Sequence, residues 1–495
     1  MTPEEVDRLR RSSSWDGVRV VVAGFGVSGA AAADNLLFLG ATVTALDEAT
    51  SEEKADRAHL LETLGATVRL EPGATAVLPD DVDLVVTSPG WRPDAALLAQ
   101  AAERGVPVWG EVELAWRLRD PENPAPWLAV TGTNGKTTTV QMLDSILLAA
   151  GLRSIAVGNV GRPIVEAVMD PEPHDVLAVE LSSFQLHYTS SMRAESAAVL
   201  NLAEDHLDWY DDVPGGPTGM EQYAADKARI FEGVERACVY NAADPATERM
   251  VRGADVAEGA RAIGFTLAMP GVGMVGVVED LLVDRAFIDE RATSAAELCT
   301  LADLASDAPH FVANALAAAA LARAHGVSQQ AVRDGLRAFR PDGHRIALVA
   351  THEGVSWVDD SKATNPHAAM SSLRAYESVV WVAGGLAKGA RFDHLVSQVR
   401  GRLRGVVLIG RDRQVIAEAL ARHAPDVPVI VIGEGETGDP MDRVVAAAAR
   451  LTTPGDTVLL APGCASMDMF ANYGARGDAF ADAVRRLLGT AGPST

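Results

Sequence analysis

One short run of the sequence combines glycines, a lysine and hydroxyl side chains. It follows the apolar stretch 127–130, precedes a helical pattern at 140–150, and reads Thr131-Gly132-Thr133-Asn134-Gly135-Lys136-Thr137-Thr138. Backbone N–H groups of such a loop surround phosphate oxygens, the lysine offsets their charge, and the following hydroxyl reaches Mg²⁺. Val130 stands where a strict Walker A motif has its first glycine. The run predicts a phosphate-binding loop, with a chance glycine turn as the alternative.

Three further residues have side chains suited to metal or proton chemistry. Glu180 ends the apolar run 175–179, and a carboxylate at that end of a parallel strand reaches the crevice where ligands bind. Mg²⁺ prefers one or two such oxygens together with phosphates, so Glu180 is a candidate ligand, although a surface carboxylate fits the same pattern. By their patterns alone, His206 is typical of a core histidine and Lys227 of a solvated helix lysine.

A second glycine motif lies near the N-terminus. Gly24-Phe-Gly26-Val-Ser-Gly29 follows a strand pattern at 19–23, and Asp47 ends the next strand pattern. In dinucleotide-binding proteins such glycines let backbone N–H groups approach a pyrophosphate, and the acid binds a ribose. The pattern alone leaves three interpretations open: NAD or FAD binding, binding of another nucleotide diphosphate, and a structural tight turn.

The elements that would position these motifs are predicted from hydrophobic patterning. Strands are expected at 19–23, 41–46 and 83–87, with a helix at 30–39, and this alternation predicts a parallel sheet. The turn Ser88-Pro89-Gly90 ends the last of these strands. The proline-rich stretch 120–127 is typical of a linker.

Two more α/β segments follow the linker. The second runs from 127 to about 340 and contains a glycine- and proline-rich insertion at 211–220, which we expect to be a mobile loop. In the third, strands are expected at 355–358, 378–383, 405–409, 428–432 and 457–461. We therefore predict three consecutive α/β domains, at 1–120, 121–340 and 341–495, of Rossmann-like, P-loop-type and Rossmann-like architecture.

Composition excludes several classes of protein. The formal net charge of -24 argues against nonspecific nucleic-acid binding, which needs a basic face, but not against local phosphate binding. The three cysteines are far apart and form no CxxC pair, so neither a disulfide framework nor a structural zinc site is expected. No signal peptide is predicted, and the apolar stretch 311–322 is too short to span a bilayer. We expect a reduced, cytoplasmic protein without membrane contact.

Taken together, the motifs resemble those of a known family. The segments TGTNGKTT, ELSSFQL, EDHLD and DKARIF occur in the order found in the Mur ligase superfamily, the ATP-dependent amide ligases of peptidoglycan synthesis. Near the C-terminus, the segments DSKATNP at 360–366, GG at 384–385 and APGCASMD at 461–468 are similar to those of the members that add D-glutamate. The resemblance spans residues 18–485.

The resemblance implies the reaction and its ligands. The substrates would be ATP, D-glutamate and UDP-N-acetylmuramoyl-L-alanine, joined through an acyl phosphate by a monomer with two Mg²⁺ ions. The residues implied to bind ATP are Gly132, Thr133, Asn134, Gly135, Lys136, Thr137, Thr138, Asn314, Arg345 and Asp360. Those implied to bind the UDP-linked substrate are Gly26, Val27, Ser28, Asp47, Ser88, Pro89, Gly90, Asn159 and Ser182.

The remaining implied roles concern catalysis, metal and the amino acid. D-glutamate binding is implied for Lys362, Thr364, Lys388, Ser466 and Tyr473. Catalytic roles are implied for Lys136, Glu180, His206, Lys227 and Lys388. Metal binding is implied for Thr137, Glu180, His206 and Lys227, the last carbamylated by CO₂.

The chain departs from the family pattern at several positions. Phe311 replaces an asparagine that would contact adenine, Tyr473 replaces a phenylalanine, and Ala49 stands where a basic contact to the uracil nucleotide is expected. The loop between His206 and Lys227 is also longer than usual.

Rival interpretations explain less of the chain. An NAD-dependent dehydrogenase built on the first glycine motif would leave the second loop and the third domain unexplained. A folylpolyglutamate synthase shares the ATP domain, but it is not expected to carry the N-terminal glycine motif. A binding module without activity would need neither the metal ligands nor the amine-binding segments.

Overall fold

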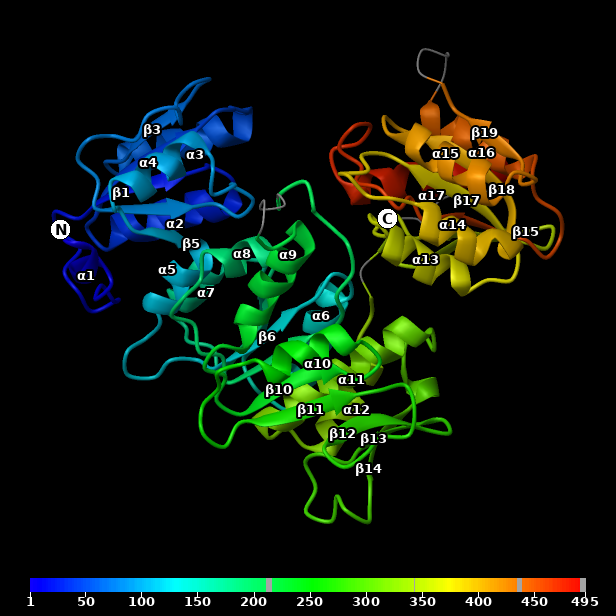
Figure 1. The fold of residues 1–495 in the computed structure, drawn as a ribbon, viewed down its shortest axis with the longest axis horizontal. Helices are drawn as coiled ribbons and strands as arrows, with labels where there is room; N and C mark the ends of the chain where they lie inside the picture. The colour runs from blue at the N-terminus through cyan, green and yellow to red at the C-terminus, as the bar shows by residue number, and fades with distance from the viewer. Residues whose placement is uncertain (211–215, 342, 434–438, 490–495) are drawn as a thin grey trace. The chain divides into compact units, whose positions relative to one another are not determined.

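The computed structural model describes residues 1–210, 216–341, 343–433 and 439–489. They form three sheets and divide into two compact units (Figure 1). The first unit comprises Met1–Leu202 and Glu221–Phe339, and the second comprises Ala203–Met220 and Arg340–Thr495. The α/β class is confirmed, whereas the boundaries of a three-domain division stay a prediction. Of the loop predicted at 211–220, residues 211–215 lie outside the described part.

The N-terminal sheet is wholly parallel, in the order β3-β2-β1-β4-β5. Its strands are β1 (Arg19–Ala23), β2 (Thr42–Asp47), β3 (Thr67–Leu70), β4 (Leu84–Thr87) and β5 (Val108–Gly110). The helices of this part are α1 (Pro3–Val6), α2 (Val27–Phe38), α3 (Glu52–Thr63), α4 (Ala96–Glu103) and α5 (Glu111–Arg117). The central strands are valine-rich because helices bury both faces of a parallel sheet. The predictions missed β3 and β5, which have only four and three residues.

The second sheet is parallel from β7 to β12 and antiparallel from β12 to β14, in the order β14-β13-β12-β11-β10-β9-β6-β8-β7. Its strands are β6 (Trp127–Thr131), β7 (Ser154–Gly158), β8 (Val176–Glu180), β9 (Ser196–Val199), β10 (Ala237–Asn241), β11 (Arg261–Phe265), β12 (Met274–Val278), β13 (Leu281–Asp284) and β14 (Ala296–Thr300). Its helices are α6 (Lys136–Ala149), α7 (Ile164–Val168), α8 (Ser183–His187), α9 (Gly219–Ala228), α10 (Pro245–Arg252), α11 (Pro309–His325) and α12 (Gln329–Ala338), with 3-10 turns at Arg229–Phe231 and Leu301–Asp303. The alanine-rich helix α11 is buried along most of its length, as expected.

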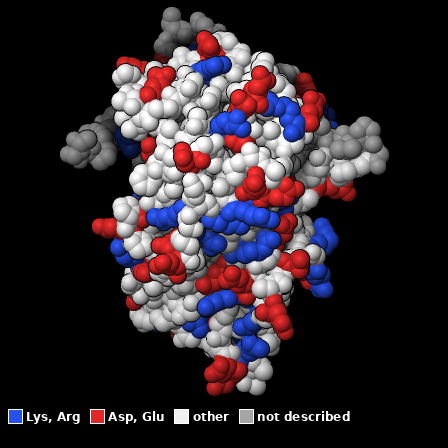
Figure 2. Space-filling view, turned by 90° about the vertical axis from the view of Figure 1, so that its left-hand side faces the viewer, with Lys and Arg blue, Asp and Glu red and all other residues white. Residues whose placement is uncertain are grey.

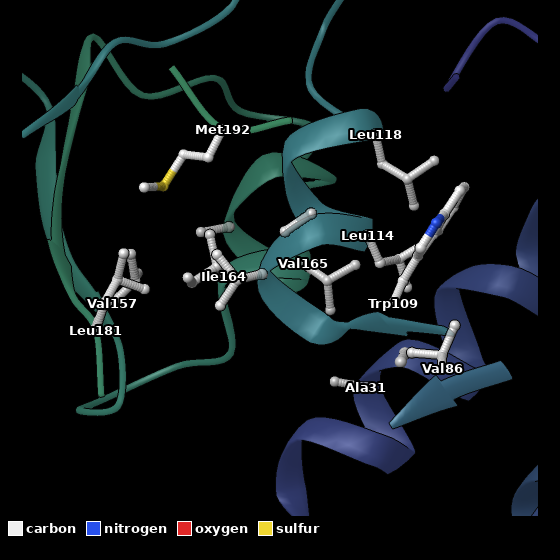
Figure 3. Packing of buried hydrophobic residues seen from close by; sticks show 14 of the residues in the cluster. Ala31, Val86, Trp109, Leu114, Leu118, Val157, Ile164, Val165, Leu181 and Met192 are labelled. Carbon is white, nitrogen blue, oxygen red and sulfur yellow. The ribbon is translucent and has the colours of Figure 1, made fainter. Parts of the chain in front are cut away.

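One continuous hydrophobic core joins the first two sheets, which explains why they form a single unit. Figure 3 shows Leu114 of α5 beside Trp109, with Ile164 and Val165 of α7 in the same cluster. At this junction the Glu111 carboxylate accepts a hydrogen bond of 2.7 Å from the backbone N–H of Val165. Each such apolar side chain contributes about 1.5–3 kcal/mol when it is fully buried.

The third sheet belongs to the second unit and has the order β15-β16-β20-β17-β18-β19. Its strands are β15 (Ala347–His352), β16 (Val355–Asp359), β17 (Val379–Gly384), β18 (Leu403–Ile409), β19 (Val429–Val431) and β20 (Thr457–Leu460). Its helices are α13 (Pro366–Arg374), α14 (Asp393–Val399), α15 (Arg413–His423), α16 (Pro440–Ala449) and α17 (Tyr473–Leu488), with a 3-10 turn at Arg400–Arg402. The five predicted strands are present. The missed strand, β15, is an antiparallel edge strand with partly exposed side chains.

The surface carries charges of both signs. On the face that Figure 2 shows, lysines and arginines form small groups among acidic side chains. None of the described helices combines the length and the apolar character needed to cross a membrane.

Candidate active site

The predicted phosphate-binding loop connects the end of β6 to the start of α6. Gly132 and Gly135 have φ angles of 153° and 84°, in the region that favours glycine. Gly135 is the N-cap of α6 and provides no side-chain cap, so the helix begins with the arrangement that binds anions elsewhere. The strand–loop–helix context predicted for the motif is therefore present.

Asn201, two residues after the end of the neighbouring strand β9, holds this loop by hydrogen bonds. Its carbonyl oxygen accepts a hydrogen bond from Thr133 N–H at 3.0 Å. Its side-chain amide oxygen accepts from Asn134 N–H at 2.9 Å, and its amide nitrogen donates to the Asn134 carbonyl at 3.0 Å. Asn201 was not among the predicted site residues, because only the adjacency of β9 and β6 brings it to the loop.

Two lysines converge on the carbonyl oxygen of Gly132. Lys136 Nζ donates to this oxygen and to the Thr133 carbonyl, both at 2.9 Å. Lys227 Nζ, from α9, donates to the same Gly132 oxygen at 2.9 Å and lies 4.5 Å from the centre of the Tyr223 ring. Because Lys227 is only 1% exposed, the interpretation as a solvated helix lysine is wrong. The packing of α9 against the loop buries it.

Glu180 lies at the end of β8, paired in register with Val130 at the start of the loop. It is 2% exposed, so the interpretation as a surface carboxylate is wrong. Its Oε1 atom accepts a hydrogen bond of 2.9 Å from Asn159 Nδ2, whereas Oε2 is buried without a hydrogen-bond partner among the described residues. An unpaired buried oxygen is costly, and a metal that prefers oxygen ligands would satisfy it. Thr137, also buried, is the second residue of α6.

Two other predicted residues of the first unit have defined surroundings. Asn314, on α11, lies against the loop, since a Cβ placed on Gly135 would approach its Oδ1 atom to 2.4 Å. Ser182 is the N-cap of α8 and accepts a hydrogen bond from the Gln185 N–H. Phe311, at the departure from the family pattern, is a core residue whose ring lies 6.1 Å from that of Phe339.

The N-terminal glycine motif forms a tight turn onto α2. A Cβ on Gly29 would lie 1.9 Å from the Gly24 carbonyl oxygen, so only glycine allows this approach of helix and turn. The Ser88 hydroxyl donates to the same carbonyl at 3.0 Å. Gly26 and Val27, at the start of α2, are exposed and Ser28 is half-buried, which leaves this end of the helix accessible to a ligand. The adjoining Pro89 and Gly90 lie at least partly in solvent.

Asp47 supports this turn. Its Oδ2 atom accepts from the Phe25 N–H at 2.7 Å and from Lys54 Nζ at 2.8 Å, and its Oδ1 atom accepts from the Ala49 N–H. Burial opposes ionisation, but these hydrogen bonds outweigh it and hold the pKa of Asp47 below its usual value. Lys54 Nζ also donates to the Ala49 carbonyl at 3.3 Å, so a cation lies next to the position where this chain has alanine in place of the basic residue of the family pattern.

In the second unit, the predicted D-glutamate residues Lys362 and Tyr473 are in contact. Lys362 Nζ donates to the Tyr473 hydroxyl at 3.0 Å. Arg476, which is 1% exposed, donates to the Ser361 hydroxyl at 2.9 Å and to the Cys464 carbonyl at 3.1 Å. It thereby joins the segments 360–366 and 461–468, the latter containing the buried Ser466. No local pattern around Arg476 indicates this role.

A cavity of about 260 Å³ in the second unit brings together three predicted residues, namely His206, Thr364 and Lys388. Asn365 Nδ2 donates to Asp205 Oδ2 at 3.1 Å and so connects the segment that carries His206 to the DSKATNP segment. The interpretation of His206 as a core histidine is wrong, since it is half-buried and lines this cavity.

Asp360 is buried near Arg345 in the same unit. The Ser372 hydroxyl and the Ile346 N–H donate to its carboxylate. Burial raises the pKa of Asp360 to about 7, against the opposing effects of Ser372 and Arg345. The contacts of Asp360, Arg345, His206 and the D-glutamate residues with the phosphate loop of the first unit stay predictions.

The fold and the loop define a multidomain α/β protein with a P-loop-type nucleotide site. Models of the Mur ligase middle domain and of the Mur ligase, glutamate ligase domain match residues 130–322 and 344–464. The chain belongs to the Mur ligase family.

Its relatives are similar over nearly their full length. The UDP-N-acetylmuramoylalanine--D-glutamate ligase of Streptomyces avermitilis is 62% identical, over 96% of this chain and 99% of the relative. The enzyme of the same name from Thermobifida fusca is 56% identical over the same shares. A solved pseudomurein peptide ligase type C from Methanothermus fervidus, 16% identical, shares the fold with a TM-score of 0.57 over 95% of this chain and 100% of that chain.

Proposed function

We propose that this protein joins D-glutamate to UDP-N-acetylmuramoyl-L-alanine, with conversion of ATP to ADP and phosphate, in the synthesis of peptidoglycan precursors. The observation that carries the proposal is the arrangement of Lys136, Lys227 and Glu180 around the phosphate loop. The similarity to ligases of that name over nearly the whole chain supports the choice of substrates. A cytoplasmic location and a monomeric state are further predictions.

The reaction divides into two substrate steps. The alanyl carboxylate attacks the γ-phosphate of ATP, so a C–O–P linkage forms and ADP leaves. The amine of D-glutamate then attacks the acyl carbon, the C–N bond forms, phosphate leaves, and the amine loses its proton. Lys136 and the loop would bind the ATP phosphates, because phosphoryl transfer depends chiefly on positioning and on offsetting charge.

Thr137 and Glu180 would hold one Mg²⁺, and the unpaired Oε2 atom of Glu180 fits that role. Bound Mg²⁺ supplies positive charge at the phosphates. We further propose that Lys227 is carbamylated: its neutral amine attacks CO₂, an N–C bond forms and a proton leaves. The carbamate, with His206, would provide ligands for a second Mg²⁺. The burial of Lys227 beside the loop supports this assignment.

The other predicted residues would bind the remaining ligands. Asn314 would contact adenine beside Gly135, and Arg345 and Asp360 would contact ATP from the second unit. The open start of α2, with Asp47 and the 88–90 turn, would bind the uridine diphosphate, and Asn159 and Ser182 the muramoyl part. Lys362, Thr364, Lys388, Ser466 and Tyr473 would bind D-glutamate.

Amino-acid dependence of phosphate release tests the proposal. The purified protein is given ATP, Mg²⁺ and UDP-N-acetylmuramoyl-L-alanine, together with D-glutamate, L-glutamate, L-alanine or a diamino acid in separate assays. We expect phosphate release with D-glutamate alone. Release with another amino acid would contradict the assigned substrate, and release with a folate and L-glutamate would favour folylpolyglutamate synthesis.

A further inference from the structure

Trp91 lies beside the first glycine of the N-terminal motif. Gly24 has a φ angle of 92°, and a Cβ placed on it would lie 2.8 Å from the indole nitrogen of Trp91 and 2.9 Å from the Ser88 side chain. The indole N–H therefore occupies the side of Gly24 that a side chain would otherwise fill. Any other residue at 24 would displace Trp91.

The position of Trp91 is fixed by the central part of the first unit. The hydroxyl of Tyr188, the residue that follows α8, donates a hydrogen bond of 2.7 Å to the Trp91 carbonyl. Both side chains pack against a buried cluster beneath the N-terminal sheet that includes Val21, Ala23 and Leu46. Burial raises the pKa of Tyr188, so its hydroxyl keeps its proton and remains a donor over the working pH range. Trp91 is thus held by its backbone and by one side of its ring.

The indole N–H of Trp91 has no acceptor among the described residues. It donates no hydrogen bond within the part of the chain that the structure describes, although the residue is half-buried. An indole nitrogen can only donate, so it is satisfied by water or by a ligand acceptor. It lies next to a glycine turn and a helix start without a side-chain cap, where backbone N–H groups bind phosphate.

We infer that Trp91 is a further binding residue for the UDP-linked substrate, and that its indole N–H donates a hydrogen bond to an oxygen of the diphosphate. The inference rests on the proposed function, which supplies the diphosphate. It adds a side-chain donor to a site otherwise formed by backbone groups of the glycine motif. Because the Tyr188 hydroxyl bonds to the Trp91 carbonyl, the position of the indole N–H depends on the central part of the unit.

Replacement of Trp91 by phenylalanine tests the inference, because the variant keeps an aromatic ring against the buried cluster and removes the indole N–H donor together with the smaller ring of the indole. For Trp91→Phe we expect the Kd of UDP and the KM of UDP-N-acetylmuramoyl-L-alanine to rise about tenfold or more, the scale for a hydrogen bond to a charged group. The kcat and the KM values of ATP and D-glutamate should stay within about twofold. Tyr188→Phe removes only the hydrogen bond to the Trp91 carbonyl, so it should weaken UDP binding less than Trp91→Phe does.

A second measurement does not depend on the stability of a variant. In wild-type protein with ¹⁵N-labelled indoles, eight tryptophans give separate N–H signals, and UDP should shift one strongly downfield. Loss of that signal in Trp91→Phe, or in Trp91→Tyr if the first variant does not fold, assigns it. Absence of any indole shift at saturating UDP, or UDP binding by Trp91→Phe within twofold of wild type, would overturn the inference. An equal rise in the KM of ATP would also overturn it, because it would indicate a general structural effect.

The two proposals fail in different ways. If wild-type protein does not join D-glutamate to the UDP-linked substrate, the proposed function is wrong. If wild type is active and only the Trp91 result is negative, the proposed function stands and the assignment of Trp91 fails.

Discussion

Lys136 and Lys227 direct their ammonium groups at the same oxygen atom, the carbonyl of Gly132, each at 2.9 Å. They reach it from different helices, α6 and α9, which are far apart in the sequence. Two ammonium groups that share one acceptor repel each other. Bound phosphate would offset the charge of Lys136, and conversion of Lys227 to a carbamate would remove its positive charge altogether.

Removal of the Lys136 side chain should affect catalysis far more than folding. We expect Lys136→Ala to lower kcat by roughly 10²–10³ or more, the scale for the loss of one charge contact in the transition state. ATP-dependent phosphate release measures the effect, with Arg57→Ala as a matched loss of positive charge at a half-buried residue of α3 that pairs with Glu53. Turnover within a few-fold of wild type would remove the loop from the ATP site.

Lys227 can be tested by chemical rescue. Lys227→Ala should be nearly inactive and should regain part of its activity in acetate, which offers an oxygen ligand in the vacated space. Lys227→Arg should not be rescued, since its guanidinium stays charged and fills the site. Mass spectrometry of protein kept under CO₂ complements the assays. Full activity of Lys227→Arg would refute the carbamate.

The two oxygens of Glu180 have different surroundings, so substitutions that affect one or the other should change Mg²⁺ binding to different extents. Glu180→Gln should raise the Mg²⁺ concentration for half-maximal activity by about tenfold or more, because it removes a charged oxygen ligand. Asn159→Ala removes only the hydrogen bond that orients Oε1, so it should raise the Mg²⁺ concentration for half-maximal activity less than Glu180→Gln does. Glu172→Gln, at an exposed carboxylate, is the control. A Mg²⁺ requirement unchanged in Glu180→Gln would exclude Glu180 as a ligand.

The buried carboxyl group of Glu111, at the junction of α5 and α7, should make the stability of the protein depend on pH. Burial raises the pKa of Glu111 from 4.5 to about 7, so the folded state holds a proton that the unfolded state has already lost. Its contribution to stability is therefore fully present below about pH 4.5 and is lost as the pH rises through about 7. Glu111→Gln, neutral throughout, should lack this loss.

Calorimetric Tm values at several pH values between about 5 and 8 measure the difference between wild type and Glu111→Gln. The Tm of the variant relative to that of wild type should increase as the pH rises. A difference independent of pH would show that the pKa of Glu111 is not raised in the folded protein, and one of opposite sign would show that it is lowered.

Much of the fold was predictable because the strands that carry the site are long, apolar and buried. The strands β1, β6 and β8 are predicted directly by their apolar runs, and the positions of the motifs at their ends follow from the geometry of parallel sheets. The short strands β3 and β5 and the exposed edge strand β15 lack that signal. Their pairing depends on neighbouring strands rather than on their own composition.

The sequence by itself determined the phosphate loop, the carboxylate that ends β8 and the family. These depend on residues close together in the chain, whose types and spacing already limit the backbone to a strand–loop–helix. Tertiary structure alone decided that Lys227 is buried at Gly132, that Asn201 holds the loop, and that Trp91 lies against Gly24. Burial and contacts between distant segments arise only when helices and strands pack, and a single residue such as Lys227 carries no local mark of whether water or protein will surround it.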